Sequence, residues 1–206
     1  MISTQGFACA TVRERQQPPS VSAMARLPYL SVSDLAEEDR DLLARDINLH
    51  RLLAHSPAGA RAFTHLSTWI RYHCALDARL RELVILQIGY CSGSDYEFSH
   101  HIQIGRDFGV SDEDINAIMT ETRGEDSHLG KLDRLVVTAA REMVKQGAIQ
   151  ENTLASLATV LSNQELIELV MIASFYVGVV HLLASLNIDV ETHYLPYLAQ
   201  FPLAAS

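Results

Sequence analysis

The hydrophobic positions of this chain recur mainly three and four residues apart, which is the spacing of one face of an α-helix. Phe63, Leu66 and Ile70 follow this spacing within a segment that opens at Ser56. No stretch alternates apolar and polar residues for long enough to predict a strand. The pattern predicts an all-α fold, a helical bundle of about eight or nine helices.

Capping residues and glycines mark where these helices begin and end. Asp77, Ser94 and Ser111 stand where an N-cap is expected, and Gly109 and Gly147 stand where a helix should stop. The tail around 194–197 should form an ordered strap. We expect helices at about residues 34–44, 47–54, 57–73, 77–90, 94–108, 111–122, 132–146, 151–160 and 162–187.

The composition is typical of one soluble domain with a sizeable core. The chain has 206 residues, of which 48% are hydrophobic and 20% are charged. We expect residues 24–206 to form a single helical domain. Residues 1–23 lack the apolar core of a signal peptide, so we expect them to be a disordered leader.

The net charge and the cysteine content limit the classes of binding partner and the cellular compartment that we expect. The formal net charge of −9 argues against nucleic acid and anionic membranes, because both need clustered Lys and Arg. The longest apolar stretch, 166–186, is interrupted by Glu168, Gly178 and His181, so we interpret it as a buried core helix. The three cysteines form no CxxC pair, which disfavours a redox dithiol or a zinc knuckle. We expect a cytoplasmic protein that acts on a small-molecule substrate.

The best candidates for chemistry lie between Glu82 and His101. This stretch reads ELVILQIGYCSGSDYEFSHH and breaks between two predicted helices at 91–93. Ser94, Glu97 and His101 fall at i, i+3 and i+7 on the second helix, so a hydroxyl, a carboxylate and an imidazole share one face. Glu82 would join them if the two helices pack antiparallel. An imidazole takes up a proton near pH 7 and a carboxylate beside it orients it, so the group suits proton transfer.

Structural roles would explain the same residues. Ser94 could be only a helix cap, Glu97 a solvated side chain and His101 a hydrogen-bonded core histidine. Metal binding is disfavoured because His100 and His101, as neighbours on a helix, diverge by about 100°, and the chain has no HExxH pair. Cys91 has no base three or four residues along the helix, which favours a buried, inert thiol.

The stretch from Leu80 to Met119 resembles the carboxymuconolactone decarboxylase family, which includes the alkylhydroperoxidase D-like proteins. It carries an LREL-type helix, a YEF turn into a second helix, a histidine and a GVSDEDI cap. Weaker similarity extends over about 24–190, including the NLHRLLAHSP segment at 48–57. The resemblance implies an all-α bundle of the alkylhydroperoxidase D-like type that assembles as a homo-oligomer, a trimer or a hexamer.

The resemblance also implies a branch of the family. The peroxidase branch has a glutamate, eleven residues, a CxxC pair, three residues and a histidine. Glu82 and His101 match this pattern, but Ser94 and Glu97 stand where the two cysteines would be. A serine cannot form the disulfide of thiol-based peroxide turnover. The decarboxylase branch lacks the cysteine pair, and similarity to it implies proton transfer and decarboxylation, without a cofactor or a metal, on a small lactone or keto-acid.

In this branch the resemblance gives each candidate a role. The expected catalytic residues are His101, Glu97 and Glu82, and the expected substrate-binding residues are Ser94, Tyr96 and His100. His101 would be the acid or base, and the two glutamates would tune or orient it. Two alternatives stay open. One is a peroxide-linked oxidoreductase that uses Cys91 as a lone thiol, and the other is a non-catalytic binding protein that keeps the fold.

Overall fold

The structure, a computed structural model, describes residues 25–203. Within this range it contains nine α-helices and no strand, which confirms the predicted all-α fold. The α-helices are α1 (Asn48–Leu53), α2 (Pro57–Tyr72), α3 (Ala78–Cys91), α4 (Asp95–Asp107), α5 (Asp112–Thr122), α6 (Lys131–Gln146), α7 (Glu151–Leu157), α8 (Asn163–Leu186) and α9 (Leu195–Gln200). Three short 3-10 helices are η1 (Val32–Asp34), η2 (Glu37–Leu43) and η3 (Thr192–Tyr194). The expected leader, residues 1–23, lies outside the described residues.

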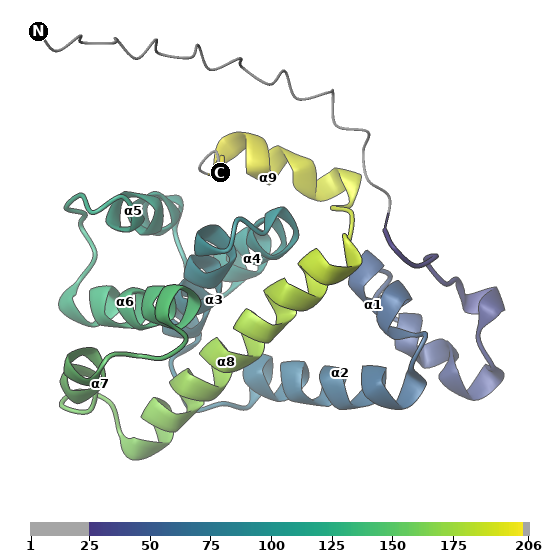
Figure 1. Ribbon diagram of the computed structural model, residues 1–206, viewed down its shortest axis with the longest axis horizontal. Coiled ribbons are helices and arrows are strands. Elements are labelled where there is room, and N and C mark those ends of the chain that lie inside the picture. Colours follow the sequence, from purple (N-terminus) through teal and green to yellow (C-terminus); the bar gives the residue numbers. More distant parts are fainter. Residues whose placement is uncertain (1–24, 204–206) are drawn as a thin grey trace, which may run out of the picture.

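Helix α3 lies at the centre of the bundle. Every residue from 80 to 90 is buried, because this part of the helix is apolar on nearly every side. Helix α3 packs against α4, α5, α6 and α8, and α8 crosses in front of it in Figure 1. The few polar side chains that α3 carries, among them Glu82 and Gln87, are therefore held inside the protein, where they need partners.

Helices α3 and α4 approach each other closely just before the turn that joins them. A Cβ atom on Gly89 would stand 3.0 Å from the backbone nitrogen of Phe98, so a larger residue would push the helices apart. The turn itself passes through Gly93, whose φ of 60° suits glycine. The close approach brings the first turns of α3 next to the middle of α4, where Glu82 and His101 face each other.

Most of the expected caps form. Asp77 accepts a hydrogen bond from the backbone nitrogen of Leu80 at the start of α3. Ser111 and Asp114 form a capping box at the start of α5. Gly147 ends α6 with a φ of 79°. These local signals explain why the predicted bounds of α3 to α8 lie close to the observed ones.

The predicted short helix at 34–44 forms as two 3-10 helices, η1 and η2, and not as one continuous α-helix. Leu35 and Leu43 are the buried hydrophobic residues of this segment, which is too little apolar surface to hold a longer α-helix. The acidic residues of η2 contact another element instead. Asp39 and Asp41 accept hydrogen bonds from the guanidinium of Arg61 on α2.

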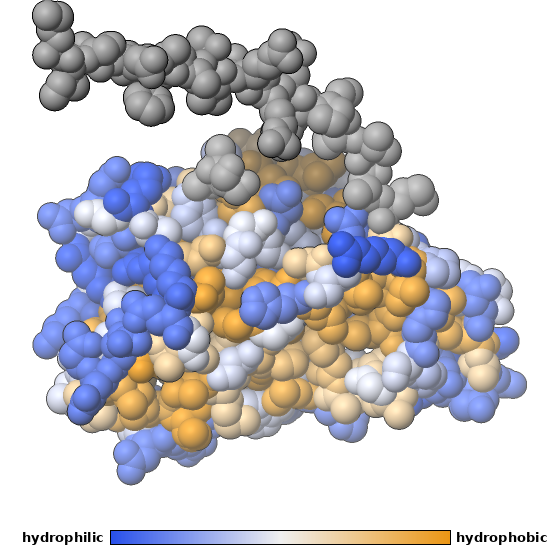
Figure 2. All heavy atoms as spheres, in the orientation of Figure 1, coloured by the Kyte–Doolittle hydropathy of each residue, from blue (hydrophilic) through white to orange (hydrophobic). Residues whose placement is uncertain are grey.

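Helix α8 has one buried face and one exposed apolar face. By length and composition it is the one helix within residues 25–203 that could cross a membrane. Its buried residues, among them Leu169 and Ile172, pack in the core, where α8 contacts α3 and α6 as a core helix does. Its outer face exposes Ile167 and Met171, and apolar residues gather over this side of the molecule in Figure 2. The expected homo-oligomer stays a prediction.

Candidate functional site

Three of the predicted catalytic residues meet between α3 and α4. Glu82 Oε2 lies 2.7 Å from His101 Nδ1. Glu97 Oε1, one turn before His101 on α4, lies 3.1 Å from the other ring nitrogen, Nε2. All three side chains are buried. The predicted convergence of these residues is therefore confirmed, and the imidazole of His101 is held between two carboxylates.

Arg81 holds the carboxylate oxygen of Glu82 that does not contact His101. Its Nε donates a hydrogen bond of 3.0 Å to Glu82 Oε1, and its Nη1 donates to the main-chain oxygen of Arg71 on α2. A row of buried charged side chains thus runs from Arg81 through Glu82 and His101 to Glu97, and we call this row the relay. The relay begins in the packed core and ends at Glu97.

The two carboxylates keep the His101 ring protonated at neutral pH. Burial alone would lower the pKa of His101, but the charges and hydrogen bonds of Glu82 and Glu97 outweigh burial and raise the pKa to about 9. Burial would raise the pKa of Glu82, but His101 and Arg81 beside it bring the pKa below its usual value. The relay therefore alternates in charge from Arg81 to Glu97 and carries no net charge.

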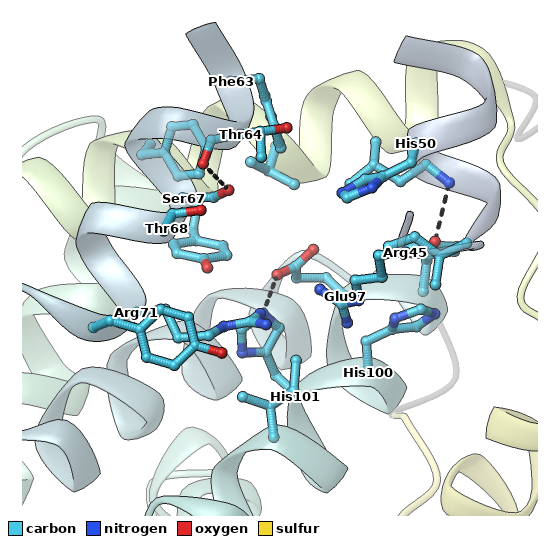
Figure 3. Close-up of a pocket in the computed structure, with 18 residues that line it drawn as sticks. Arg45, His50, Phe63, Thr64, Ser67, Thr68, Arg71, Glu97, His100 and His101 are labelled. Atoms are coloured by element: carbon cyan, nitrogen blue, oxygen red, sulfur yellow. Dashed lines mark hydrogen bonds and ion pairs between the residues drawn. The ribbon is translucent and has the colours of Figure 1, made fainter. Parts of the chain in front are cut away.

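A cavity of about 230 Å³ opens beside Glu97 and His101. Figure 3 shows the Glu97 carboxylate directed into this cavity, with His50 on one side and Thr64 and Ser67 on the other. Glu97 Oε1 is buried, and its contact among the described residues is the ion pair with His101 Nε2, which lacks good hydrogen-bond geometry. Glu82 is not part of the cavity wall, because it lies behind His101. Glu97 is thus the end of the relay that a bound molecule would meet.

Much of the cavity wall is apolar. Phe63 on α2 and Phe175 and Val179 on α8 line it. Tyr176 on α8 also lines it and packs edge-on against His101 with ring centroids 5.2 Å apart. Burial raises the pKa of Tyr176 well above its usual value, so its hydroxyl stays protonated. The wall suits a small molecule with an apolar body.

Tyr96 and His100 also line the cavity, but their polar atoms are engaged elsewhere. The Tyr96 hydroxyl donates a hydrogen bond of 3.1 Å to one oxygen of Glu191, and His100 Nε2 lies 2.7 Å from the other. The His100 ring is stacked between the rings of Tyr96 and Tyr194, at centroid distances of 4.1 and 3.7 Å. We call Tyr96, His100, Glu191 and Tyr194 the clamp, because they tie α4 to the C-terminal segment. A role for Tyr96 and His100 in substrate binding stays a prediction.

The clamp holds a neutral histidine. Burial lowers the pKa of His100, although the hydrogen bond and the charge of Glu191 oppose this. Burial would raise the pKa of Glu191, but hydrogen bonds from His100 and from the backbone nitrogen of Asn48 lower it to about 2. At neutral pH His100 therefore donates its Nε2 hydrogen to an ionised Glu191.

One stretch of the chain is similar to a known protein family. Residues 57–123 match the sequence profile of the carboxymuconolactone decarboxylase family. This part of the chain is therefore similar to that family. The matched span covers α2 to α5 and so includes Glu82, Glu97 and His101. No curated protein matches the sequence.

Solved structures with this fold include alkylhydroperoxidase D-like proteins. An uncharacterized peroxidase-related protein from Ralstonia eutropha, an alkylhydroperoxidase AhpD core, aligns with a TM-score of 0.70 at 14% identity over 84% of this chain and 95% of that chain. A variant of the debrominase Bmp8 in complex with 2,3,4-tribromopyrrole aligns with a TM-score of 0.69 at 18% identity over 86% of this chain and 96% of that chain. A peroxidase-related protein from Silicibacter sp. gives a TM-score of 0.67 at 14% identity, over 87% of this chain and 97% of that chain. At these identities the likeness shows the fold alone.

Ser94 lies apart from the other predicted site residues. Its Oγ accepts a hydrogen bond of 3.4 Å from the backbone nitrogen of Glu97, and the side chain is not part of the cavity wall. An N-cap turns its oxygen onto the first turn of its own helix, which leads it away from the face that carries Glu97 and His101. The structure therefore places Ser94 as the cap of α4 and gives no support to its predicted contact with substrate.

Cys91 is separate from the cavity. Burial raises the pKa of its thiol, and its sulfur accepts a hydrogen bond of 2.9 Å from Gln87 Nε2. It does not line the cavity. A thiol with a raised pKa, away from the cavity, is a poor nucleophile, which argues against the lone-thiol alternative. Over residues 25–203, no group of three or more His, Cys, Asp or Glu side chains is arranged to hold a metal ion.

Several polar residues around the cavity and the clamp were not singled out from the sequence, among them Arg45, His50, Arg71 and Glu191. His50 falls within the NLHRLLAHSP segment that resembles the family, which was the one available signal. Glu191 lies 91 residues beyond His100 in the sequence, and no motif connects them. Only the folded chain brings these residues together, because each comes from a different helix or loop.

Proposed function

We propose that this protein is a cofactor-independent enzyme that moves a proton to or from a carbon atom of a small organic acid, as in the decarboxylation of a lactone or keto-acid. The observation that carries the proposal concerns Glu97. It is a buried carboxylate on the wall of a cavity, and its Oε1 is paired with the protonated ring of His101, 3.1 Å from Nε2. A carboxylate in this position can exchange a proton with a molecule bound in the cavity.

His101 supplies and recovers that proton. Its pKa of about 9 keeps both ring nitrogens protonated at neutral pH. Its Nε2 lies 3.1 Å from Glu97 Oε1, so a proton can pass between the two side chains. Glu82 binds Nδ1 on the opposite edge of the ring and fixes its orientation. Glu97 contacts the substrate, while His101 and Glu82 act through it.

The decarboxylation step balances without a redox partner. The bond between the substrate carbon and its carboxylate carbon breaks, CO₂ leaves, and the electron pair stays on the substrate carbon, delocalised into an adjacent carbonyl. The proton of His101 Nε2 reaches that carbon through Glu97, and solvent returns a proton to the relay. No electrons are gained or lost overall. A positioned acid of this kind contributes a rate factor of about 10² to 10⁴.

Two further observations support this chemistry over thiol chemistry. The positions that hold the cysteine pair in the peroxidase branch carry Ser94 and Glu97 here. The remaining candidate thiol, Cys91, is partly buried, has a raised pKa and lies outside the cavity wall. Peroxide turnover by a thiol needs an accessible thiolate, and Cys91 does not provide one.

A turnover assay on a panel of lactone acids and keto-acids tests the proposal. The parent chain should release CO₂ from at least one member faster than the uncatalysed reaction. Glu97→Gln keeps the shape of the side chain but removes its proton exchange, so it should lower kcat by about 10²- to 10⁴-fold. Cys91→Ala is the matched control and should keep the parental rate, because the thiol lies outside the cavity.

Two outcomes would contradict the proposal. Equal rates in the parent and in Glu97→Gln would remove Glu97 from the mechanism. A parent chain that binds acids of the panel but turns over none of them would favour the non-catalytic alternative.

A further inference from the structure

Two arginines that line the cavity have no ion-pair partner within residues 25–203. Arg45 lies between η2 and α1, and Arg71 lies in the last turn of α2; both line the cavity and are half-buried. Neither guanidinium lies within 4 Å of a carboxylate in the described part of the chain. By contrast, the arginines at 51, 61, 79, 81, 106, 123, 134 and 141 all have such a partner.

Both arginines border the same cavity, and their charges act on the same neighbouring residues. Figure 3 shows them on opposite sides of Glu97, with His50 above Arg45. Burial lowers the pKa of His50, and the positive charges of both Arg45 and Arg71 lower it further. The charge of Arg71 also acts on the Tyr176 hydroxyl at the far wall. The hydrogen bond from Arg81 Nη1 to the main-chain oxygen of Arg71 fixes this side of the cavity relative to the relay.

The charge balance of the cavity is opposite to that of the whole protein. The relay sums to zero, because Arg81 and His101 offset Glu82 and Glu97. The positive charges of Arg45 and Arg71 are therefore uncompensated within the cavity, although the chain as a whole carries a formal charge of −9. Half-buried positive charges without partners attract an anion of matching size.

We propose that Arg45 and Arg71 form a carboxylate-binding subsite, which holds a small organic acid by its acid group and places its apolar body against Phe63 and Phe175. Guanidinium groups bind carboxylates through paired, charge-assisted hydrogen bonds, which fix orientation as well as position. The cavity of about 230 Å³ lies below the usual range for drug-sized ligands, so the acid is small.

The subsite gives the proposed enzyme its substrate class, and that part of the inference rests on the proposed function. Ion pairing stabilises a carboxylate and so opposes its loss as CO₂. The carboxylate that Arg45 and Arg71 bind is therefore not the group that leaves as CO₂, and it remains on the product. The carbon atom that reacts lies at another position of the substrate, next to Glu97. Binding of the acid itself does not depend on turnover.

Calorimetric titration of the full chain with matched acids and amides tests the subsite. The probes are phenylacetate, benzoate and phenylpyruvate, each beside its uncharged amide. At least one acid should bind about ten-fold or more tightly than its amide, and added salt should weaken that preference. This comparison needs no substitution, so it holds even if a variant fails to fold. Equal binding of every acid and its amide, or no binding of any acid, would overturn the subsite.

Variants of the two arginines locate the binding. Arg45→Gln and Arg71→Gln should each weaken acid binding about ten-fold or more and leave amide binding unchanged. Arg123→Gln is the matched control, because Arg123 is exposed and paired with Glu125, and should bind like the parent. Parental acid binding in both cavity variants would overturn the subsite even if turnover depends on Glu97. Conversely, acid binding that needs both arginines, in a chain without turnover, would refute the proposed function and keep the subsite.

Discussion

His100 and His101 are neighbours on α4, yet they lie in opposite electrostatic environments. The His101 ring lies between two carboxylates, and its pKa is raised to about 9. The His100 ring is stacked between two tyrosines beside a single carboxylate, and its pKa is lowered. One histidine is therefore charged at neutral pH and the other is neutral.

The difference comes from the elements that each ring faces. Adjacent residues on a helix point about 100° apart, so His101 turns toward α3 and His100 toward the C-terminal segment. Helix α3 offers Glu82 from a core position, where no water screens the pair. The C-terminal segment offers the partly buried Glu191, and burial of the ring outweighs this one charge. The protonation state of each histidine is therefore set by its tertiary neighbours, and the two adjacent histidines in the sequence do not by themselves reveal it.

Replacing each histidine with leucine should break the comparison most strongly. His101→Leu leaves two carboxylates buried without the positive charge between them, which should cost about 3–5 kcal/mol of unfolding free energy. His100→Leu leaves one partly buried carboxylate short of a donor and should cost about 1–3 kcal/mol. Urea unfolding at pH 7 measures both. Equal losses would show that the two environments do not differ as described.

The second largest effect is expected in the pH dependence of stability, to which His101 and His100 should contribute in opposite directions. The folded pKa of His101 is above its usual value of 6.5, so its contribution of about 3 kcal/mol is fully present below pH 6.5 and is lost as pH rises through about 9. The folded pKa of His100 is lowered, so below pH 6.5 only the unfolded state gains that proton and stability falls. Urea unfolding from pH 5 to 10 checks both directions.

The same histidine variants sharpen this test. His101→Leu should flatten the alkaline side of the stability curve, and His100→Leu should flatten part of the acidic side. An alkaline side that is unchanged in His101→Leu would assign the effect to another group.

Glu191→Gln should have a smaller effect, confined to the clamp. The amide keeps the shape of the carboxylate but loses the charge that accepts from Tyr96, His100 and the Asn48 backbone, which should cost about 1–2 kcal/mol. Because Glu191 does not contact His101, the titration of His101 should stay where it is in the parent. Urea unfolding and a histidine titration measure the two effects, and a shifted His101 titration would show that clamp and relay are coupled.

Cys91→Ala should change least of all. The thiol is partly buried beside Gln87 and contacts neither the clamp nor the relay, so stability should change by about 1 kcal/mol or less. Turnover of any substrate acid should stay parental. A large loss of turnover in this variant would return Cys91 to the mechanism.

Local signals explain what the sequence could predict. Local capping signals predict most helix bounds, because each signal acts within one turn of its own helix. Examples are the N-caps Asp77 and Ser111, and Gly147 after α6. Helical spacing placed Glu97 and His101 on one face of α4. The short connection between α3 and α4 then made Glu82 a reasonable third member.

Other features depend on contacts that sequence spacing does not encode. Arg45, Arg71 and Glu191 reach the site from the η2–α1 segment, the end of α2 and the segment before η3. Ser94 fits both a cap and a site residue by spacing, and only the orientation of its hydroxyl decides between them. The segment at 34–44 shows helical spacing, but it buries too little apolar surface to form one α-helix.

The central claim is that two buried carboxylates keep His101 protonated at neutral pH, and histidine-ring NMR tests it most directly. Spectra of the ¹⁵N-labelled parent chain, assigned with His100→Leu and His101→Leu, follow both rings from pH 5 to 10. The account predicts that His101 carries hydrogens on Nδ1 and Nε2 at pH 7 and loses one near pH 9, while His100 stays neutral from pH 7 upward. A His101 ring that is neutral at pH 7, or that titrates at or below 6.5, would contradict the account.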